Sequence, residues 1–362
     1  MDKTTKYYVN PNVEKCVRIF PEQGRYDYYR YDMNENPEGL PEDFVKDTIQ
    51  EITPGFLATY PEPDIFLNKY AKFIGVDFEN VLSTNGSDMA IRYLLEIFCK
   101  EGNKVVTINP SFEMYAVNCS ILGLRHKPVD CEEDLSVCVE KIIEAIDDET
   151  DVVVLLNPNN PIGKAYTMEE MCAVVDKARE KGAIVIVDEA YHYFYDKTFI
   201  PKALEYDNVV VLRTFSKLFS MAACRLGLII SNKTIIDCVR KSRLTFEVNA
   251  VALKFAERLL DKPDIITNMI EEEKAGKQYT IDTLRQRGYE VIDGIGNYVF
   301  VRTRKDTHDL EKNLKQQKRI LIKTYGNKWL KEYIRVSVGS TRVMQYFVDA
   351  LIELDCQKGE KI

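Results

Sequence analysis

The chain has 362 residues, which allows two or three domains of ordinary size. Hydrophobic residues make up 45% and charged residues 29%, proportions that exclude a disordered or fibrous chain and permit a large buried core. The net charge of −8 disfavours a surface that follows the phosphates of a nucleic-acid duplex. An anionic ligand must therefore be bound by a few local groups.

The nine cysteines are scattered along the chain without a Cys-x-x-Cys pair, and only three histidines accompany them. This pattern predicts reduced thiols, a cytoplasmic protein and no metal site. The N-terminal residues lack the apolar core of a signal peptide, and the sequence contains no uncharged run of about 18 apolar residues. We therefore expect neither secretion nor a membrane span.

The composition changes along the chain and predicts three regions. Residues 1–45 are polar and aromatic, include the run 34–37 (NENP), and predict an N-terminal arm that packs with the small domain. Residues 46–247 are expected to form a large ligand-binding domain. From 248 to the C-terminus, long charged helices and short strands predict a smaller α+β domain.

Short runs rich in Val and Ile alternate with helical patterns from about residue 80. Continuous apolar runs are typical of strands covered on both faces, so they predict an α/β fold with a largely parallel sheet. A capping box at Thr167 and Glu170 and a stop at Gly182 predict a helix over 168–181. The predicted strands are 105–108, 152–156, 184–187, 209–212 and 228–230, and in the smaller domain 298–301, 320–322 and 334–338. The further predicted helices are 248–261, 265–288 and a last one whose apolar face carries Met344, Phe347, Val348, Leu351 and Ile352.

Four polar segments lie at or just after the ends of predicted strands, where open α/β sheets bind their ligands. The first, 84–88 (TNGSD), lies between a strand ending near Leu82 and a helix beginning near Met89, whose free N–H groups favour an anion. The second, 157–163 (NPNNPIG), offers Asn amide donors to a ligand oxygen. Taken alone, each of these two segments is better explained as an ordinary helix cap or an ordinary turn.

The third segment, 188–191 (DEAY), begins with a carboxylate at the end of a buried strand, which requires a cation from either a ligand or a structural ion pair. The fourth, 214–217 (TFSK), is followed eight residues later by Arg225. Burial at a strand end lowers the pKa of a lysine toward the amine that attacks a carbonyl, and the Arg225 fork suits phosphate. A solvated surface lysine is the alternative for Lys217 alone.

Together the four segments supply an amine for an aldehyde, a carboxylate for a ring nitrogen, donors for a phenolic oxygen and a cup for a phosphate. This set meets every polar group of pyridoxal 5'-phosphate (PLP). In this order the segments resemble the fold-type I PLP-dependent class I/II aminotransferases, above all the histidinol-phosphate aminotransferase group, from about Asn34 to Arg342. The resemblance implies a mostly parallel seven-stranded sheet sandwiched by helices, a smaller C-terminal domain and a homodimer with shared active sites.

The resemblance also implies roles for individual residues. Lys217 matches the lysine that forms an imine with the cofactor and moves the α-proton. Asp188 matches the carboxylate that keeps the pyridine nitrogen protonated, and Tyr191 and Asn160 match the pair that binds the phenolic oxygen. The other implied cofactor contacts are a phosphate cup of Gly86, Ser87, Asp88, Thr214, Ser216 and Arg225, a stacking ring from Phe112, and Tyr60, which reaches the phosphate in the neighbouring subunit.

For the substrate, the resemblance implies contacts from Arg335, Lys323 and Asn36. Arg335 matches the residue that binds the substrate α-carboxylate through two parallel hydrogen bonds. Histidinol phosphate has no carboxylate, so Arg335 would bind its phosphate instead. Lys323 lies near the position where histidinol-phosphate aminotransferases typically carry an Arg, and it lacks the bidentate fork.

The expected reaction is a ping-pong transfer of an amino group between an amino acid, or a phosphorylated amino compound such as histidinol phosphate, and a keto acid in amino-acid biosynthesis. A PLP-dependent decarboxylase of a threonine-phosphate or serine-phosphate type is the first alternative, because the sequence does not fix which bond breaks. A PLP-binding regulatory module without turnover is the second. A plain nucleotide-binding domain is not supported, because neither G-x-G-x-x-G nor a P-loop occurs. We expect small-molecule substrates, and neither nucleic-acid nor membrane partners.

Overall fold

The computed structural model describes residues 7–18, 20 and 23–356. Its main element is a seven-stranded sheet in the order β2-β8-β7-β6-β5-β3-β4. Its strands are parallel except β8, which is antiparallel to both of its neighbours. The strands are β2 (Val81–Asn85), β3 (Lys104–Asn109), β4 (Arg125–Asp130), β5 (Thr150–Leu156), β6 (Ile184–Asp188), β7 (Val209–Thr214) and β8 (Leu226–Ser231).

The five Val- and Ile-rich runs predicted for this sheet lie within β3, β5, β6, β7 and β8, which confirms them. In β6, Val185 and Val187 pack on one face and Ile186 packs on the other, so both faces require apolar side chains. β8 is antiparallel because the chain returns from β7 through residues 215–225, without the crossover helix that a parallel connection needs.

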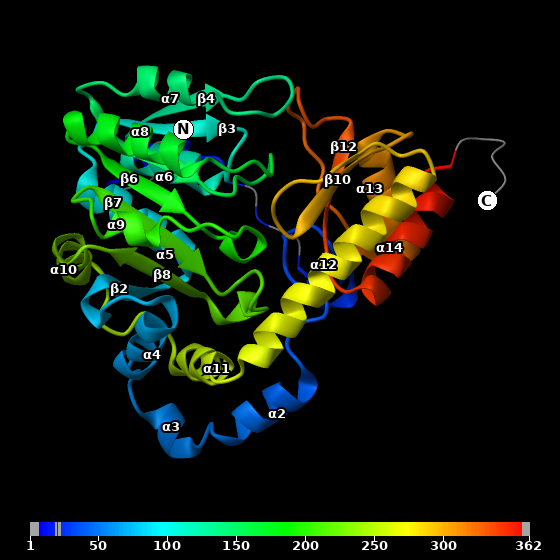
Figure 1. Cartoon of the computed structure of the whole chain (residues 1–362), viewed down its shortest axis with the longest axis horizontal. Coiled ribbons are helices and arrows are strands. Elements are labelled where there is room, and N and C mark those ends of the chain that lie inside the picture. The colour runs from blue at the N-terminus through cyan, green and yellow to red at the C-terminus, as the bar shows by residue number, and fades with distance from the viewer. Residues whose placement is uncertain (1–6, 19, 21–22, 357–362) are drawn as a thin grey trace.

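Helices cover both faces of the sheet (Figure 1). α5, α6 and α10 contribute apolar side chains to the core on the Ile186 face, and α4, α7, α8 and α11 contribute to the opposite core. The predicted capping box is present, since the Thr167 hydroxyl accepts from the Glu170 N–H at 3.2 Å and the Glu170 carboxylate accepts from the Thr167 N–H at 2.7 Å. These helices are α4 (Asp64–Ile74), α5 (Gly86–Phe98), α6 (Met114–Leu122), α7 (Val139–Ala145), α8 (Met168–Glu180), α10 (Lys233–Ser242) and α11 (Ala250–Leu260).

The second part of the structure is built on a three-stranded antiparallel sheet in the order β12-β10-β9. The long helix α12 runs from the large sheet to this part (Figure 1). The predicted helices correspond to α11, α12 and the last helix α14, and the predicted strands correspond to β10, β11 and β12. The elements are α12 (Pro263–Gln286), β9 (Val291–Ile292), β10 (Tyr298–Arg302), α13 (Thr307–Lys318), β11 (Ile320–Leu321), β12 (Tyr333–Ser337) and α14 (Thr341–Leu354).

The N-terminal region is anchored to this second part. β1 (Tyr29–Arg30) pairs in parallel with β11, and the buried Tyr31 hydroxyl donates to the Val343 carbonyl at 2.9 Å. The other elements of this region are α1 (Pro11–Lys15), α2 (Glu42–Gln50) and α3 (Pro54–Ala58), while the short α9 (Ile200–Ala203) precedes β7. α2 crosses the expected boundary at residue 45, and residues 1–6, 19, 21–22 and 357–362 of the expected domains lie outside the described residues.

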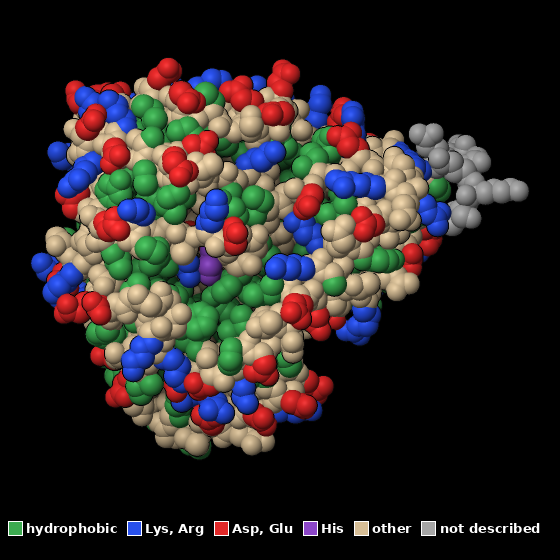
Figure 2. Space-filling model, viewed as in Figure 1, with side chains coloured by type: hydrophobic (Ala, Val, Ile, Leu, Met, Phe, Trp, Pro, Cys, Tyr) green, Lys and Arg blue, Asp and Glu red, His purple; other side chains and the backbone are tan. Residues whose placement is uncertain are grey.

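Figure 2 shows acidic and basic side chains interspersed over one face, with hydrophobic side chains gathered near its centre. Such a mixed distribution accords with a ligand bound by a few local groups rather than by a broad field of one charge. Within the described part of the chain, no helix has the length and apolar composition that crossing a bilayer requires.

One carboxyl in α12, that of Glu273, is buried without a hydrogen-bond partner among the described residues. Glu273 is 2% exposed, and neither of its carboxyl oxygens has a hydrogen-bond partner among the described residues. Burial, followed by the nearby charge of Glu38, raises the pKa of Glu273 well above its usual range. The folded protein must therefore either keep a proton on Glu273 or bury a charge there.

We predict that Glu273→Gln stabilises the protein at pH 8 by about 1–3 kcal/mol, because it removes an uncompensated carboxyl. Because the pKa of Glu273 is raised in the folded state, the wild type loses stability as the pH rises above the pKa of about 4.3 that a Glu has in the unfolded chain. The stability gained by Glu273→Gln should therefore be smaller at pH 5 than at pH 8. Urea denaturation of both proteins at the two pH values measures the difference. A gain that is larger at pH 5 than at pH 8 would contradict the prediction.

Candidate active site

A cavity of about 330 Å³ opens at the carboxyl ends of β5, β6 and β7, between the large sheet and the second part. Parallel strands bring their carboxyl ends to one edge, which is why segments far apart in sequence meet there. Most of the predicted site residues line this cavity. They are Ser87, Asp88, Phe112, Asn160, Asp188, Tyr191, Thr214, Ser216, Lys217, Arg225, Lys323 and Arg335.

Lys217 reaches the cavity from the connection that follows β7. Its Nζ donates to the Met33 carbonyl at 2.8 Å and lies 5.9 Å from the centre of the Tyr191 ring. Burial, and next the positive charge of Arg335, lowers the pKa of Lys217 to about 8. Near neutral pH the neutral amine, the form that attacks carbonyls, is therefore far more populated at Lys217 than at an exposed lysine.

Asp188 lies at the end of β6 and is 3% exposed. Burial raises its pKa to about 6, while hydrogen bonds from the Tyr115 hydroxyl at 2.8 Å and the Ala190 N–H at 3.1 Å oppose that shift. The adjacent Glu189 instead forms a buried ion pair with Arg213 at 2.8 Å. Of the two carboxylates in this segment, Asp188 faces the ligand cavity and Glu189 makes the structural ion pair.

The anion-binding end of the cavity lies at the first turn of α5. The strand β2 extends to Asn85 and α5 begins at Gly86, so the helix starts earlier than the predicted start near Met89. The reason is that Asn85 pairs with Leu226 of β8, after which Gly86, with φ of +74°, turns the chain at once. Gly86 does not line the cavity, but a Cβ added there would lie 2.5 Å from Arg225 Nη2.

Arg225 is held beside this helix start by several contacts. Its guanidinium donates to the Ser216 hydroxyl at 3.3 Å, to the Ala222 carbonyl at 3.1 Å and to the Asp88 carboxylate at 3.1 Å. The Thr214 hydroxyl accepts from the Ser216 N–H at 3.1 Å. The helix N-terminus, two hydroxyls and the guanidinium thus converge on one end of the cavity, an arrangement that suits a phosphate.

At the opposite end, Arg335 projects from β12 and is 6% exposed. Its guanidinium donates to the Asn160 side-chain oxygen at 2.7 Å and to the Asp32 carbonyl at 2.5 Å, whereas its Nε has no partner in the described structure. The backbone of Lys323 pairs with that of Arg335, so the two cations line the same end of the cavity.

Phe112 lines the cavity between these ends, and its ring packs edge-on against Tyr115 with a centroid distance of 6.5 Å. Two predicted residues do not line the cavity. Tyr60 is 73% exposed and stacks on Phe246, with their ring centres 4.4 Å apart. The Asn36 side chain accepts from the Glu38 N–H at 3.0 Å, and Asn34 of the same run lines the cavity instead.

Several residues of the site were not predicted from the sequence. Tyr115 was missed although it follows Phe112 by only three residues, and its hydroxyl donates to Asp188. The backbone carbonyls of Asp32 and Met33 were missed because hydrogen bonding by a carbonyl leaves no signal in residue type. No cluster of metal-ligating side chains lies within the described part of the chain.

We predict that Gly227→Ala destabilises the protein by about 1–3 kcal/mol and weakens anion binding. A Cβ at Gly227 of β8 would lie 2.4 Å from the backbone of Gly86 and of Ser87, so it forces the start of α5 away from the sheet. Gly326→Ala is the matched control, because no atom lies within 4 Å of its added Cβ. Chemical denaturation measures both variants, and equal stabilities would contradict the prediction.

Comparisons with known proteins identify the family. The family model described as aminotransferase class I and II matches residues 29–351. A histidinol-phosphate aminotransferase of Clostridium novyi is 32% identical over 330 residues, which cover 90% of this chain and 91% of that protein.

Solved structures share the fold. Histidinol-phosphate aminotransferase from Sinorhizobium meliloti, in complex with PLP, aligns with a TM-score of 0.88 and 21% identity over 97% of this chain and 98% of its own. An L-threonine-O-3-phosphate decarboxylase of Porphyromonas gingivalis aligns with a TM-score of 0.74 and 23% identity, covering 90% and 98% of the two chains. The family match over most of the sequence confirms the resemblance of the motifs, and the chain therefore belongs to the class I and II aminotransferases, as a PLP-dependent transaminase of fold type I.

Proposed function

We propose that this transaminase moves an amino group between a phosphorylated amino compound of the histidinol-phosphate kind and a keto acid. The observation that carries the proposal is the pair of cations, Arg335 and Lys323, at the end of the cavity opposite Arg225. They supply positive charge for a second anionic group, in addition to the cofactor phosphate. The curated relatives that share about 30% of their residues with this chain and carry the name histidinol-phosphate aminotransferase also support it.

The described residues fit PLP as a cofactor. We assign its phosphate to the start of α5 with Thr214, Ser216 and Arg225, its ring nitrogen to Asp188, its phenolic oxygen to Tyr191 and Asn160, and its ring face to Phe112. The close approach of Gly86 to Arg225 supports this assignment, because a side chain at Gly86 would displace the guanidinium. When bound, PLP supplies an aldehyde that condenses with amines and a ring that withdraws electron density from the carbon that loses its proton.

Lys217 acts in two ways in this scheme. With PLP bound, the Lys217 amine would hold the cofactor through its aldehyde, and Nζ, once free, would accept and return the proton of the substrate carbon. A pKa near 8 suits both tasks, because Nζ can accept and release a proton near neutral pH. Asp188 stays ionised beside a protonated ring nitrogen because the Tyr115 hydroxyl and the Ala190 N–H stabilise its charge.

We further propose that two copies of the chain form a dimer and share their active sites. The exposed side chains of Leu57, Tyr60, Ile65, Leu244 and Phe246 support an apolar contact surface near the Tyr60–Phe246 stack. Tyr60 would then reach the cofactor phosphate in the partner, which accounts for its distance from the cavity of its own chain. Sedimentation of the PLP-loaded protein tests this proposal, and a monomer would contradict it.

We also propose that the protein works in the cytoplasm. All nine cysteines are free thiols, a usage that is typical of a reducing compartment. Cell fractionation tests this assignment, and recovery from a secreted or membrane fraction would contradict it.

We predict that covalent capture of PLP by the cofactor-free protein accelerates as pH rises through about 8, because only the neutral Lys217 amine attacks the aldehyde. Stopped-flow absorbance measures this rate. Lys217→Ala should develop no such absorbance and should lose turnover. A midpoint near pH 10, as for an exposed lysine, or normal transamination by the Ala variant would contradict the assigned role.

The substrate is tested by single half-reactions. The PLP-loaded protein is mixed with histidinol phosphate, threonine phosphate, serine phosphate or glutamate, and the conversion of PLP to pyridoxamine phosphate is followed together with release of carbon dioxide. We expect conversion without carbon dioxide and fastest with histidinol phosphate, and slower conversion by Arg335→Leu. Release of carbon dioxide from threonine phosphate would contradict the proposal and would indicate a decarboxylase instead. The fold alone does not favour decarboxylation over transamination.

A further inference from the structure

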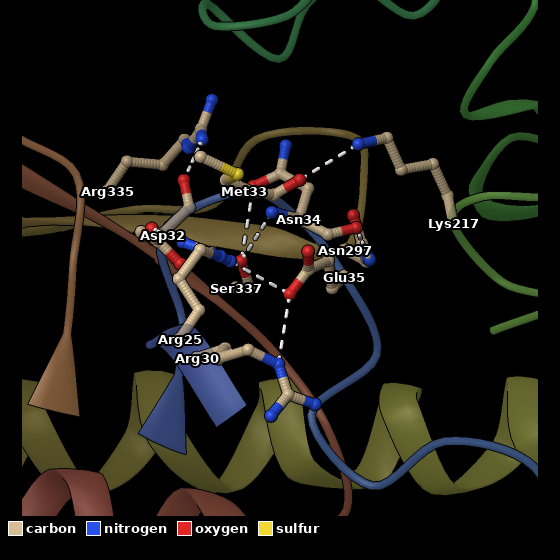
Figure 3. Close-up of polar contacts among 10 residues, drawn as sticks. All are labelled: Arg25, Arg30, Asp32, Met33, Asn34, Glu35, Lys217, Asn297, Arg335 and Ser337. Carbon is tan, nitrogen blue, oxygen red and sulfur yellow. Dashed lines mark hydrogen bonds and ion pairs between the residues drawn. The ribbon is translucent and has the colours of Figure 1, made fainter. Parts of the chain in front are cut away.

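A short N-terminal segment lines part of the cavity and contacts residues assigned to the reaction. This segment, residues 32–35, is here called the strap (Figure 3). Its Asp32 carbonyl accepts from Arg335 at 2.5 Å, and its Met33 carbonyl accepts from Lys217 at 2.8 Å. The strap therefore borders the site from a part of the chain that contains none of the four strand-end segments.

Ion pairs at its two ends hold the strap in place. Arg25 pairs with Asp32 and, at 3.0 Å, with Glu35, and Arg30 also pairs with Glu35 at 3.1 Å (Figure 3). Because several half-buried charges share this network, it restricts the path of the strap more than one exposed pair would.

Asn34, in the middle of the strap, is 1% exposed and has a left-handed backbone with φ of 55°. Its N–H donates to the Ser337 hydroxyl oxygen at 2.8 Å, and its carbonyl accepts from the Asn297 side chain at 3.1 Å. These contacts from β12 and from the residue preceding β10 fix the backbone on both sides of the side chain (Figure 3).

The hydrogen-bond network also fixes which way the Asn34 amide points. The buried Ser337 Oγ already accepts from the Asn34 N–H, so its own hydrogen needs an acceptor, and Asn34 Oδ1 at 3.3 Å supplies one. With the amide in this orientation, Nδ2 is the atom that lies 2.9 Å from the Tyr191 hydroxyl oxygen. An amide nitrogen can only donate, and the Tyr191 oxygen is therefore the acceptor. The hydrogen of Tyr191 is left free to point elsewhere, and Tyr191 lines the cavity.

We propose that Asn34 is a positioning residue that directs the Tyr191 hydroxyl into the cavity as a hydrogen-bond donor to the phenolic oxygen of the cofactor. The inference rests on the proposed function, because it needs Tyr191 beside that oxygen. By donating to Tyr191, the amide blocks the direction in which the hydroxyl would otherwise turn. It also strengthens the bond that Tyr191 donates, since linked hydrogen bonds polarise one another.

The charged groups that face Tyr191 come from three other elements. They are Asp188 of β6, Lys217 after β7 and Arg335 of β12, and the Tyr298 ring of β10 packs edge-on at 5.7 Å. Asn34 is neutral, so its replacement by another neutral residue alters none of these charges. An effect of such a replacement on the cofactor must therefore pass through the hydroxyl or through the position of the strap.

The test uses Asn34→Gly, because glycine accepts the left-handed backbone and the strap carbonyls keep their positions. The PLP-loaded protein is titrated with pH while its visible absorption band is followed. We expect the pH midpoint of this band to rise by about half a unit in Asn34→Gly. A weaker donor leaves more negative charge on the phenolic oxygen, and this charge makes the neighbouring imine nitrogen hold its proton more tightly. Tyr191→Phe should raise the midpoint further, and adding Asn34→Gly to Tyr191→Phe should change nothing more.

Arg30→Ala is the control for a loosened strap, since it removes one ion pair and leaves the Asn34 amide in place; its midpoint should equal that of the wild type. Should Asn34→Gly fold poorly, Asn34→Ala also removes the amide donor without adding a charge, and its midpoint should rise as far as that expected for Asn34→Gly. An unchanged midpoint in Asn34→Gly, or an equal rise with Tyr191 absent, overturns the inference. If Tyr191→Phe itself has no effect, the role of Tyr191 in the proposed function fails first, and the inference fails with it.

Discussion

The site depends on the burial of opposite charges at one edge of a parallel sheet. Asp188, Lys217 and Arg335 share one cavity, and an isolated buried charge would cost several kcal/mol. Each of them is therefore paired with neutral dipoles of the protein: Asp188 with Tyr115 and an N–H group, Lys217 with a strap carbonyl, and Arg335 with Asn160 and a second strap carbonyl. These dipoles lower the cost of burial without neutralising the charges that the reaction requires.

The same constraint explains how much of the site could be predicted from sequence. Asp188 ends one buried apolar run and Lys217 closely follows another, so their unusual position is visible locally, and the runs themselves predicted the strands. Tyr115 and Asn34 act across 73 and 157 residues of chain on Asp188 and Tyr191, and no local pattern reports such contacts. Asn36 was preferred to Asn34 because residue type alone does not show which side chain of the NENP run faces inward.

The start of α5 was predicted late for a related reason. Thr84 and Asn85 are polar and adjoin a glycine, which is typical of a turn, yet both pair with β8 in regular register. Pairing with a neighbouring strand outweighed local propensity, as commonly occurs in sheets. The substrate end could be predicted least, because Lys323 is exposed and lies in the connection between β11 and β12, outside any predicted strand.

The pairing of β1 with β11 joins residues 29–30 to residues 320–321, so it can form only after most of the chain has been made. Every strand of the large sheet lies before residue 232, so the ribosome can release that sheet while the anchors of the strap are still unmade. The hydrogen bond from the Asn34 N–H to Ser337 cannot form until Ser337, 303 residues further along the chain, has been synthesised. When synthesis has reached residue 232, the chain therefore carries every residue assigned to the cofactor, but it lacks Arg335 and the partners Asn297 and Ser337 that hold Asn34.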